Sequence, residues 1–195
     1  MTQDRRVRKS QQAIKSSFLQ LLKEVRFEAI TVQQLADLAD INRGTFYAYY
    51  VDKYDLLESM ENEKIDALQT FIENQHNSDG EEAPSNVVES IMSYLVEHID
   101  DNINFYQTMF AIGKASMLQE KLYRLIYNHL SAYKGKDNKI GNMPFDYFMS
   151  YVSGAGISIL KHWVEDEHRI TKEAFVDHFY NIVTVGTIGI VKQSM

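Results

Sequence analysis

Hydrogen-bonding side chains are concentrated in residues 31–53 of this 195-residue chain. Within this segment Arg43, Thr45, Tyr47 and Tyr49 stand close together in the sequence. A guanidinium donates two parallel hydrogen bonds to one partner, and each hydroxyl group donates or accepts one. Such groups suit the edges of bases and the oxygens of phosphates. The residue types therefore indicate a surface that binds nucleic acid.

Two short helices joined by a tight turn are expected to position these side chains. Thr31 and Gln34 have the spacing of a capping box, in which each side chain binds the backbone N–H of the other residue. Asp40 and Asn42 then supply turn and N-cap chemistry before a second helix. The apolar face of the first helix consists of residues at helical spacing, namely Val32, Leu35, Ala36 and Ala39.

The second helix is expected to bury one face and to expose the other. Phe46 and Tyr50 are four residues apart, so both can face the core. Two helices joined by a turn of three to four residues form the helix-turn-helix arrangement that reads DNA, with the second helix in the major groove. The face left free for this role carries Arg43, Thr45, Tyr47 and Tyr49.

The stretch Ile41–Leu57, INRGTFYAYYVDKYDLL, resembles the recognition-helix block of the TetR family of bacterial transcriptional regulators. Val7–Val25 resembles the first helix of that family, and Phe27–Thr31 resembles the link to its second helix. The family often has His where Tyr49 stands and Phe where Tyr50 stands. Tyr49 can still form hydrogen bonds, so the resemblance implies DNA binding with a changed contact at this position.

The resemblance implies an all-α protein with two domains. Residues 1–54 would form a three-helix helix-turn-helix DNA-binding domain, and residues 55–195 would form a helical domain for dimerisation and ligand binding. No alternating pattern of strand type stands out along the chain. Loops are expected at Asn74–Ser85 and Lys134–Met143, where the helical periodicity breaks.

Eight residues are assigned to DNA by their chemistry and by the resemblance. Arg43 is the best candidate for a bidentate contact to guanine, and Gln33 is the second base reader, suited to adenine. Gly44 would let the backbone approach the DNA, and Thr45 would meet a thymine methyl group or a base edge. The residues expected to hold phosphates are Thr31, Tyr47, Tyr49 and Lys53.

The distribution of charge supports this assignment. The whole chain carries a formal charge of −7, but residues 1–54 contain nine Lys and Arg against six Asp and Glu. The remaining residues contain eleven basic against twenty-one acidic side chains. The positive segment coincides with the helix-turn-helix, as phosphate binding requires.

Several classes of protein are disfavoured by the sequence. The chain has no cysteine, which excludes disulfides, thiolate nucleophiles and zinc–thiolate sites. No metal-binding histidine spacing, glycine-rich phosphate loop or nucleophile motif is evident, so we expect no enzyme activity, metal or cofactor. Neither a signal-peptide pattern nor a run of 18 apolar residues is present, which predicts a cytoplasmic protein without a membrane partner.

Two long helices are expected at about Phe145–Asp166 and Thr171–Gln193, and they carry more apolar surface than one side can bury. Small residues recur every four positions in the first of them, at Ser150, Gly154 and Ser158, and would allow a second helix to approach closely. The resemblance implies a homodimer formed through these last two helices. A two-fold dimer would present two reading heads to a palindromic DNA operator.

The resemblance also implies a small-molecule effector that binds the C-terminal domain. Aromatic and methionine side chains suited to an apolar pocket occur in its middle, but such a stripe at helical spacing is more often core than pocket. The candidate ligand-binding residues are Phe105, Tyr106, Met109, Phe110, Tyr123, Tyr127 and Met149.

The predicted function is that of a repressor which an effector releases from a palindromic operator. An activator or co-activator remains the alternative, with a C-terminal domain that binds a partner protein instead of a small ligand. This alternative depends on FYQTMF at Phe105–Phe110 and on the helix end at Trp163–Val164, which resemble a Gram-positive branch of the family.

Overall fold

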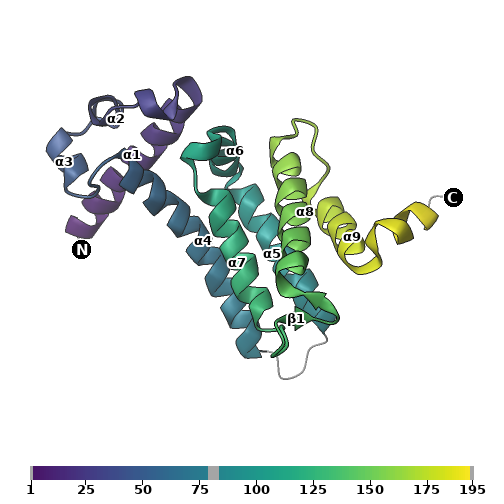
Figure 1. The fold of residues 1–195 in the computed structure, drawn as a ribbon. Coiled ribbons are helices and arrows are strands. Elements are labelled where there is room, and N and C mark those ends of the chain that lie inside the picture. The colour runs from purple at the N-terminus through teal and green to yellow at the C-terminus, as the bar shows by residue number, and fades with distance from the viewer. Residues whose placement is uncertain (1, 79–83, 194–195) are drawn as a thin grey trace. The chain divides into compact units, whose positions relative to one another are not determined.

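The computed structural model describes residues 2–78 and 84–193. Within these ranges the chain forms nine α-helices, two 3₁₀ turns and one short hairpin, which confirms the all-α class (Figure 1). The helices are α1 (Thr2–Glu24), α2 (Val32–Leu38), α3 (Arg43–Tyr47), α4 (Lys53–Ser78), α5 (Pro84–Asp101), α6 (Ile103–Ala111), α7 (Leu118–Ser131), α8 (Phe145–Glu165) and α9 (Lys172–Gln193). The 3₁₀ turns are η1 (Phe27–Ala29) and η2 (Gly113–Ala115).

The chain divides into two compact units, each with its own interior. The first contains the residues up to Lys64 and the segment Gln107–Lys121. The second contains Ile65–Tyr106 and the residues from Leu122 onward. Because α4 runs through the division expected at Tyr54, the two-domain boundary at that residue remains a prediction.

The interior of the first unit is built from one apolar face of each of its helices. Ile14 and Phe18 of α1, Leu35 of α2, Phe46 of α3 and Leu56 of α4 are all completely buried. Each such side chain stabilises the fold by roughly 1.5–3 kcal/mol relative to an exposed position. The predicted reading helix is therefore anchored by one face in the interior of this unit.

A buried carboxylate joins α4 to the start of α7 within the same unit. Glu61 is 1% exposed and accepts hydrogen bonds from the Ser116 hydroxyl at 2.6 Å and the Met117 N–H at 3.0 Å. The ammonium group of Lys121 completes the cluster at 3.0 Å. A buried charge is tolerated when it is paired and its lone pairs are satisfied, and this one is.

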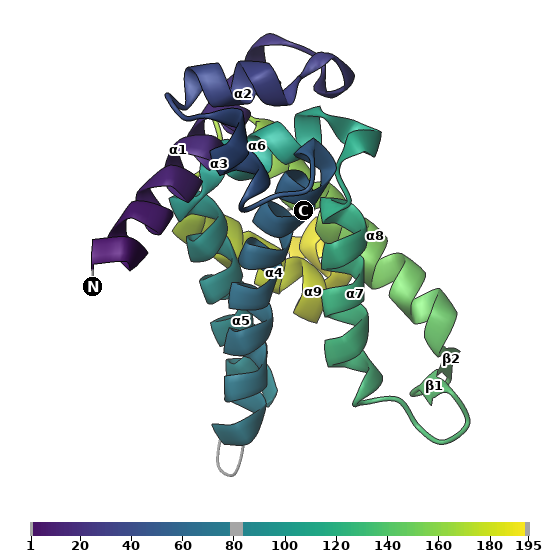
Figure 2. The ribbon, with the colours of Figure 1, turned by 90° about the vertical axis from the view of Figure 1, so that its left-hand side faces the viewer.

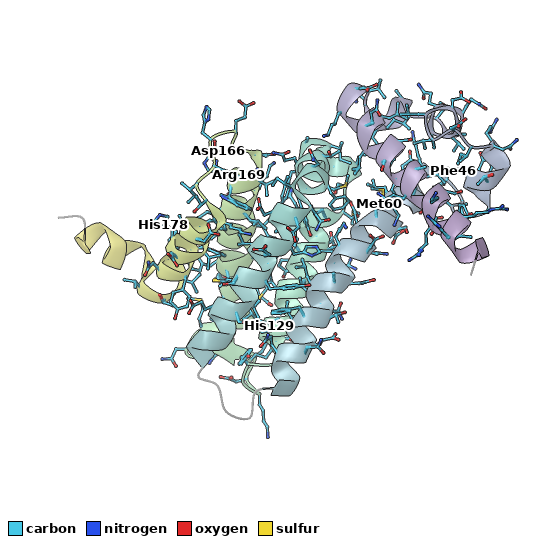
Figure 3. The ribbon with its side chains drawn as sticks, turned by 180° about the vertical axis from the view of Figure 1, so that it is seen from behind. Phe46, Met60, His129, Asp166, Arg169 and His178 are labelled. Atoms are coloured by element: carbon cyan, nitrogen blue, oxygen red, sulfur yellow. The ribbon has the colours of Figure 1, made fainter. Side chains whose placement is uncertain are left out.

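In the second unit α5 packs against α9, and the turn between α8 and α9 is held by Trp163. The Trp163 indole donates to the Ile170 carbonyl at 2.9 Å, and its ring lies 4.9 Å from that of Phe175. Arg169, labelled in Figure 3, lies over the Trp163 ring and forms an ion pair with Asp100 at 3.0 Å. These contacts fix the start of α9 against α5.

A hairpin lies within the loop expected at Lys134–Met143. Strands β1 (Lys139–Ile140) and β2 (Met143–Pro144) pair antiparallel just before α8 (Figure 2). Positive φ angles at Asn138 (59°) and Gly141 (56°) allow the chain to reverse. Strands of two residues are too short to produce an alternating pattern, so the sequence could not reveal them.

The loop expected at Asn74–Ser85 was too long. Helix α4 continues to Ser78 and α5 begins at Pro84, leaving residues 79–83 outside the described part of the chain. Proline is favoured in the first turn of a helix, where its missing N–H is not needed. Helix α1 also begins earlier than the expected Val7, since the preceding residues include Gln3, Arg5 and Arg6, and glutamine and arginine are good helix formers.

Helix α9 contains a break that the sequence analysis did not predict. Gly186 has φ 75° and ψ 165°, a conformation that separates the helix into two segments. The start of α9 is capped by Thr171, whose hydroxyl accepts from the Ala174 N–H at 3.3 Å.

Candidate nucleic-acid interface

The start of α2 is fixed by the predicted capping box. The Thr31 hydroxyl accepts from the Gln34 N–H at 3.2 Å, and the Gln34 side-chain oxygen accepts from the Thr31 N–H at 2.9 Å. The Thr31 hydroxyl also donates to this oxygen at 2.9 Å. Its proton is therefore committed to Gln34, and a phosphate contact through Thr31 would have to replace this bond.

The turn between α2 and α3 is a complete Schellman motif. Asp40 has φ 51°, and its N–H donates to the Asp37 carbonyl at 3.3 Å. The Ile41 N–H donates to the Ala36 carbonyl at 3.0 Å. Together these bonds satisfy the last carbonyls of α2. An aspartate tolerates the left-handed region better than most residues, which explains the turn that the sequence predicted at Asp40.

Gly44 has a structural role in capping α3. Its N–H donates to the Asn42 side-chain oxygen at 2.8 Å, which confirms Asn42 as the N-cap. A Cβ atom at Gly44 would lie 3.3 Å from that same oxygen, closer than most real contacts. Glycine thus makes room for the cap, whether or not the backbone also approaches DNA there.

Helix α3 exposes the side chains expected to read DNA. Phe46 (Figure 3) and Tyr50 are buried as predicted, whereas Arg43 is exposed and Tyr47 is 50% exposed. Arg43 donates to the Tyr47 hydroxyl at 3.3 Å, and its guanidinium lies 5.8 Å from the ring centroid. This pairing limits the conformations of Arg43 before any partner arrives.

The other residues predicted to contact DNA differ in their exposure and in the hydrogen bonds that they already make. Gln33 is exposed, but its amide donates to the Asp37 carboxylate at 2.7 Å. To read an adenine, this amide would have to leave Asp37. Thr45 is half-buried on α3, and Tyr49 is half-buried just beyond its end.

Burial raises the pKa of the neighbouring Tyr50, and the carboxylates of Glu63 and Asp55 raise it further.

Lys53 occupies a position that the sequence analysis did not foresee. Its ammonium group donates to three carbonyl oxygens in η1 and directly after it, those of Phe27, Glu28 and Ile30, each at 2.8 Å. An ammonium group has only three donors, so all of them are used. In this structure Lys53 closes η1 onto α4, and the phosphate contact predicted for it would require one of these bonds to be exchanged.

Basic residues of α1 add to the positive character of this unit. Arg5, Arg6 and Lys9 are exposed along the helix. Further along α1, Lys15 pairs with Glu63 of α4. Burial acts to raise the pKa of the Glu63 carboxyl, but the hydrogen bond and charge of Lys15 outweigh it and lower that pKa below its usual value.

The residues expected to bind an effector do not line the cavity found in the second unit. That cavity has a volume of about 520 Å³ and is lined from α4, α5, α7, α8 and α9. None of the seven predicted residues is among those lining it. Five of the seven are buried in the interior, namely Phe105, Tyr106, Met109, Phe110 and Met149. These five residues have the environment of a core, which was the alternative to a pocket.

The remaining two predicted ligand residues are on α7. Tyr127 packs edge-on against Phe145 with ring centroids 5.3 Å apart, and Tyr123 is exposed. The aliphatic face of α7 lines the cavity and is not among the predicted residues, because aromatic type instead of helical face was the basis of that prediction.

Features of two other classes of protein are absent from the described residues. Across residues 2–78 and 84–193, no helix combines the length and apolarity needed to cross a bilayer. The same part of the chain contains no cluster of three or more His, Asp or Glu side chains that could hold a metal ion.

Comparison with known proteins agrees with the helix-turn-helix geometry. Residues 19–60 match the family described as bacterial regulatory proteins, tetR family. Residues 86–185 match the family described as transcriptional regulator C-terminal region. Together these matches cover the helix-turn-helix of α2 and α3 and most of the second unit. The chain belongs to the TetR family of DNA-binding transcriptional regulators, and it is not an enzyme.

Solved structures of other proteins share the fold of this chain. A TetR transcriptional regulator from Streptococcus agalactiae has a TM-score of 0.64 at 24% identity, covering 94% of this chain and 98% of that one. A TetR-family regulator from Syntrophomonas wolfei has a TM-score of 0.72 at 18% identity, covering 92% and 97%.

A sequence relative is known as well. The uncharacterized HTH-type transcriptional regulator YxbF of Bacillus subtilis is 36% identical over 47 residues. This match spans 24% of this chain and 12% of YxbF.

Proposed function

We propose that this TetR-family regulator is a homodimeric repressor that leaves a palindromic operator when a small effector binds to its C-terminal domain. The observation that carries the DNA-binding part is the exposed pair of Arg43 and Tyr47 on a helix whose other face is buried. A guanidinium held in this way can meet guanine with little loss of conformational freedom. Such a protein acts where the bacterial chromosome is, in the cytoplasm.

The roles of the other residues follow their environments. Thr45, Tyr49 and Gln33 are proposed to reach base edges or phosphates beside Arg43. Gly44 permits both the cap of α3 and a close approach of its backbone. Thr31 and Lys53 are proposed to act mainly by fixing the starts of α2 and α4, since their donors are already used.

Exposed apolar side chains on α8 and α9 support the homodimer. Tyr147 and Tyr151 of α8 are 74% and 61% exposed, and Val183 of α9 is 54% exposed. Beside them, Gly154 is exposed and has open space around its Cα. A second copy placed on a two-fold axis would cover this surface and pair two reading heads.

Selection of bound fragments from random and genomic duplexes tests this function. We expect a palindromic motif whose half-sites are about 10 base pairs apart, or a multiple of this, centre to centre. Binding indifferent to sequence, or a single asymmetric half-site, would contradict the proposal. Deletion of the gene should then raise transcription beside the selected sites, whereas lowered transcription would favour the activator alternative.

A further inference from the structure

The cavity of the second unit has an unusual chemical lining. Five helices contribute to it, mainly through aliphatic and aromatic side chains, and α8 supplies the most residues. Among the described residues that line it there is no Asp, Glu, Lys or Arg. Of these described residues, the ones with polar side-chain atoms are Tyr94, His129 (labelled in Figure 3) and Tyr151.

This lining selects against charged molecules. An ion that leaves water for an apolar cavity loses its hydration, and only an opposite charge or several hydrogen bonds can compensate. Acidic and basic side chains are absent from these walls, so neither a carboxylate nor an ammonium group would find a counterion. A hydrocarbon surface, in contrast, gains from burial in proportion to its area.

The volume sets the scale of a suitable molecule. A cavity of about 520 Å³ lies within the range of known small-molecule sites, roughly 300–1,000 Å³. A molecule on the order of ten carbon atoms is therefore of a suitable size.

We propose that this cavity is the effector site and that it takes an uncharged, mainly hydrocarbon molecule with a single hydrogen-bonding group directed to Tyr94, Tyr151 or His129. The inference deepens the proposed function, on which it rests, because it gives the chemical class of the effector. It also places the site on other residues than the seven predicted from the sequence, which lie on α6, α7 and α8 outside the lining.

The position of the cavity explains how such a molecule could influence the dimer. Tyr151 of α8 and Val183 of α9 belong both to the lining and to the exposed surface proposed to meet a second copy. Gly186, where α9 breaks, also lies on the lining. Filling the cavity would therefore act directly on the two helices that hold the dimer together.

A titration of the full-length protein, free of DNA, tests the class of ligand. The probes are 1-decanol, decanoate and decylamine, which share a ten-carbon chain and differ in charge at pH 8. Trp163, the single tryptophan, reports binding because its ring contacts Phe175 of the lining. We expect 1-decanol to bind at least tenfold more tightly than either ion. Equal or tighter binding of an ion, or no binding of any probe, would overturn the proposal.

Variants locate the site. In Gly156→Leu a Cβ would meet the Phe179 ring at 3.5 Å, an ordinary contact, and the rest of the side chain would enter the cavity. We expect 1-decanol affinity to fall at least tenfold. Ala155→Leu, at an exposed lining position, provides a second variant if the first fails to fold. His162→Leu adds the same side chain to an exposed position off the lining and should bind like the wild type.

The results separate this inference from the function on which it rests. If Gly156→Leu and Ala155→Leu fold and bind 1-decanol like the wild type, the ligand lies elsewhere and the inference fails. The selection of DNA fragments uses protein without ligand, so a palindromic motif would still support the regulator. Loss of DNA selection with retained 1-decanol binding would instead overturn the proposed function and leave the cavity as an apolar site.

Discussion

At the scale of single residues, the contact between Arg43 and Tyr47 determines what α3 can recognise. Arg43→Ala should weaken binding to the selected operator by about 1–3 kcal/mol and relax specificity at one base pair, because a bidentate contact is lost. Fluorescence anisotropy with operator and mismatched duplexes measures both effects. Arg43→Lys keeps the charge and should lose specificity more than affinity. An equal loss on every duplex would show that Arg43 contacts only phosphate.

The buried hydroxyl group of Tyr106 leads to a prediction about the stability of the fold. Its hydroxyl is completely buried and has no hydrogen-bond partner among the described residues, and burial, with a smaller effect of Tyr94, raises its pKa. Tyr106→Phe should raise the free energy of unfolding by about 1 kcal/mol, since the cost of an unsatisfied buried group disappears. Urea unfolding measures the change. A loss of stability would mean that the hydroxyl has a partner in solution.

At the scale of elements, Lys53 holds the η1 turn against the start of α4. Lys53→Met should lower the free energy of unfolding by about 2 kcal/mol, because three carbonyl oxygens lose a charged donor. Arg26→Met is the matched control, since it removes the same charge from an exposed position on the same turn. Unchanged stability with a flatter salt dependence of DNA binding would restore the phosphate contact predicted from the sequence.

The ion pair of Lys15 and Glu63 joins α1 to α4 and makes stability depend on pH. Because the folded state lowers the Glu63 pKa below its usual value of about 4.5, the pair stabilises the fold above that pH. The contribution is lost as pH falls through the lowered value. Glu63→Gln should therefore reduce the thermal midpoint at pH 7, and the difference from wild type should shrink toward pH 3.

The control for this pH effect is Glu167→Gln, at an exposed position of the turn that follows α8. Its thermal midpoint should follow that of the wild type across the same pH range. A constant difference between Glu63→Gln and wild type from pH 7 to pH 3 would show that ionisation of Glu63 does not contribute.

At the scale of the whole molecule, function depends on a second copy. Val183→Asp places a charge on the exposed apolar surface of α9 and should convert the proposed dimer to a monomer, because the charge would be buried on association. Sedimentation velocity measures the mass, and operator affinity should fall with it. Ile170→Asp changes another exposed apolar residue, in the turn before α9, and should remain dimeric. A dimeric Val183→Asp would exclude this surface.

The sequence by itself determined the local parts of this protein. The capping box of α2, the turn at Asp40, the N-cap Asn42 and the buried pair Phe46 and Tyr50 all depend on residues within four or five positions of one another. Interactions between residues so close in the sequence are set by helical geometry and side-chain type, so they can be predicted from the sequence. The family resemblance came from this segment and from the residues before it, Val7–Val25 and Phe27–Thr31.

Only the tertiary structure decided which groups meet across long separations. Lys53 reaches carbonyl oxygens 23 to 26 residues upstream, and Glu61 meets Ser116, 55 residues further on. The cavity needs one face from each of five helices. Periodicity shows that a helix has an apolar face, but not which face of which partner covers it or where space remains between them. That choice belongs to the packing of the complete chain, because close packing is a property of all the side chains together.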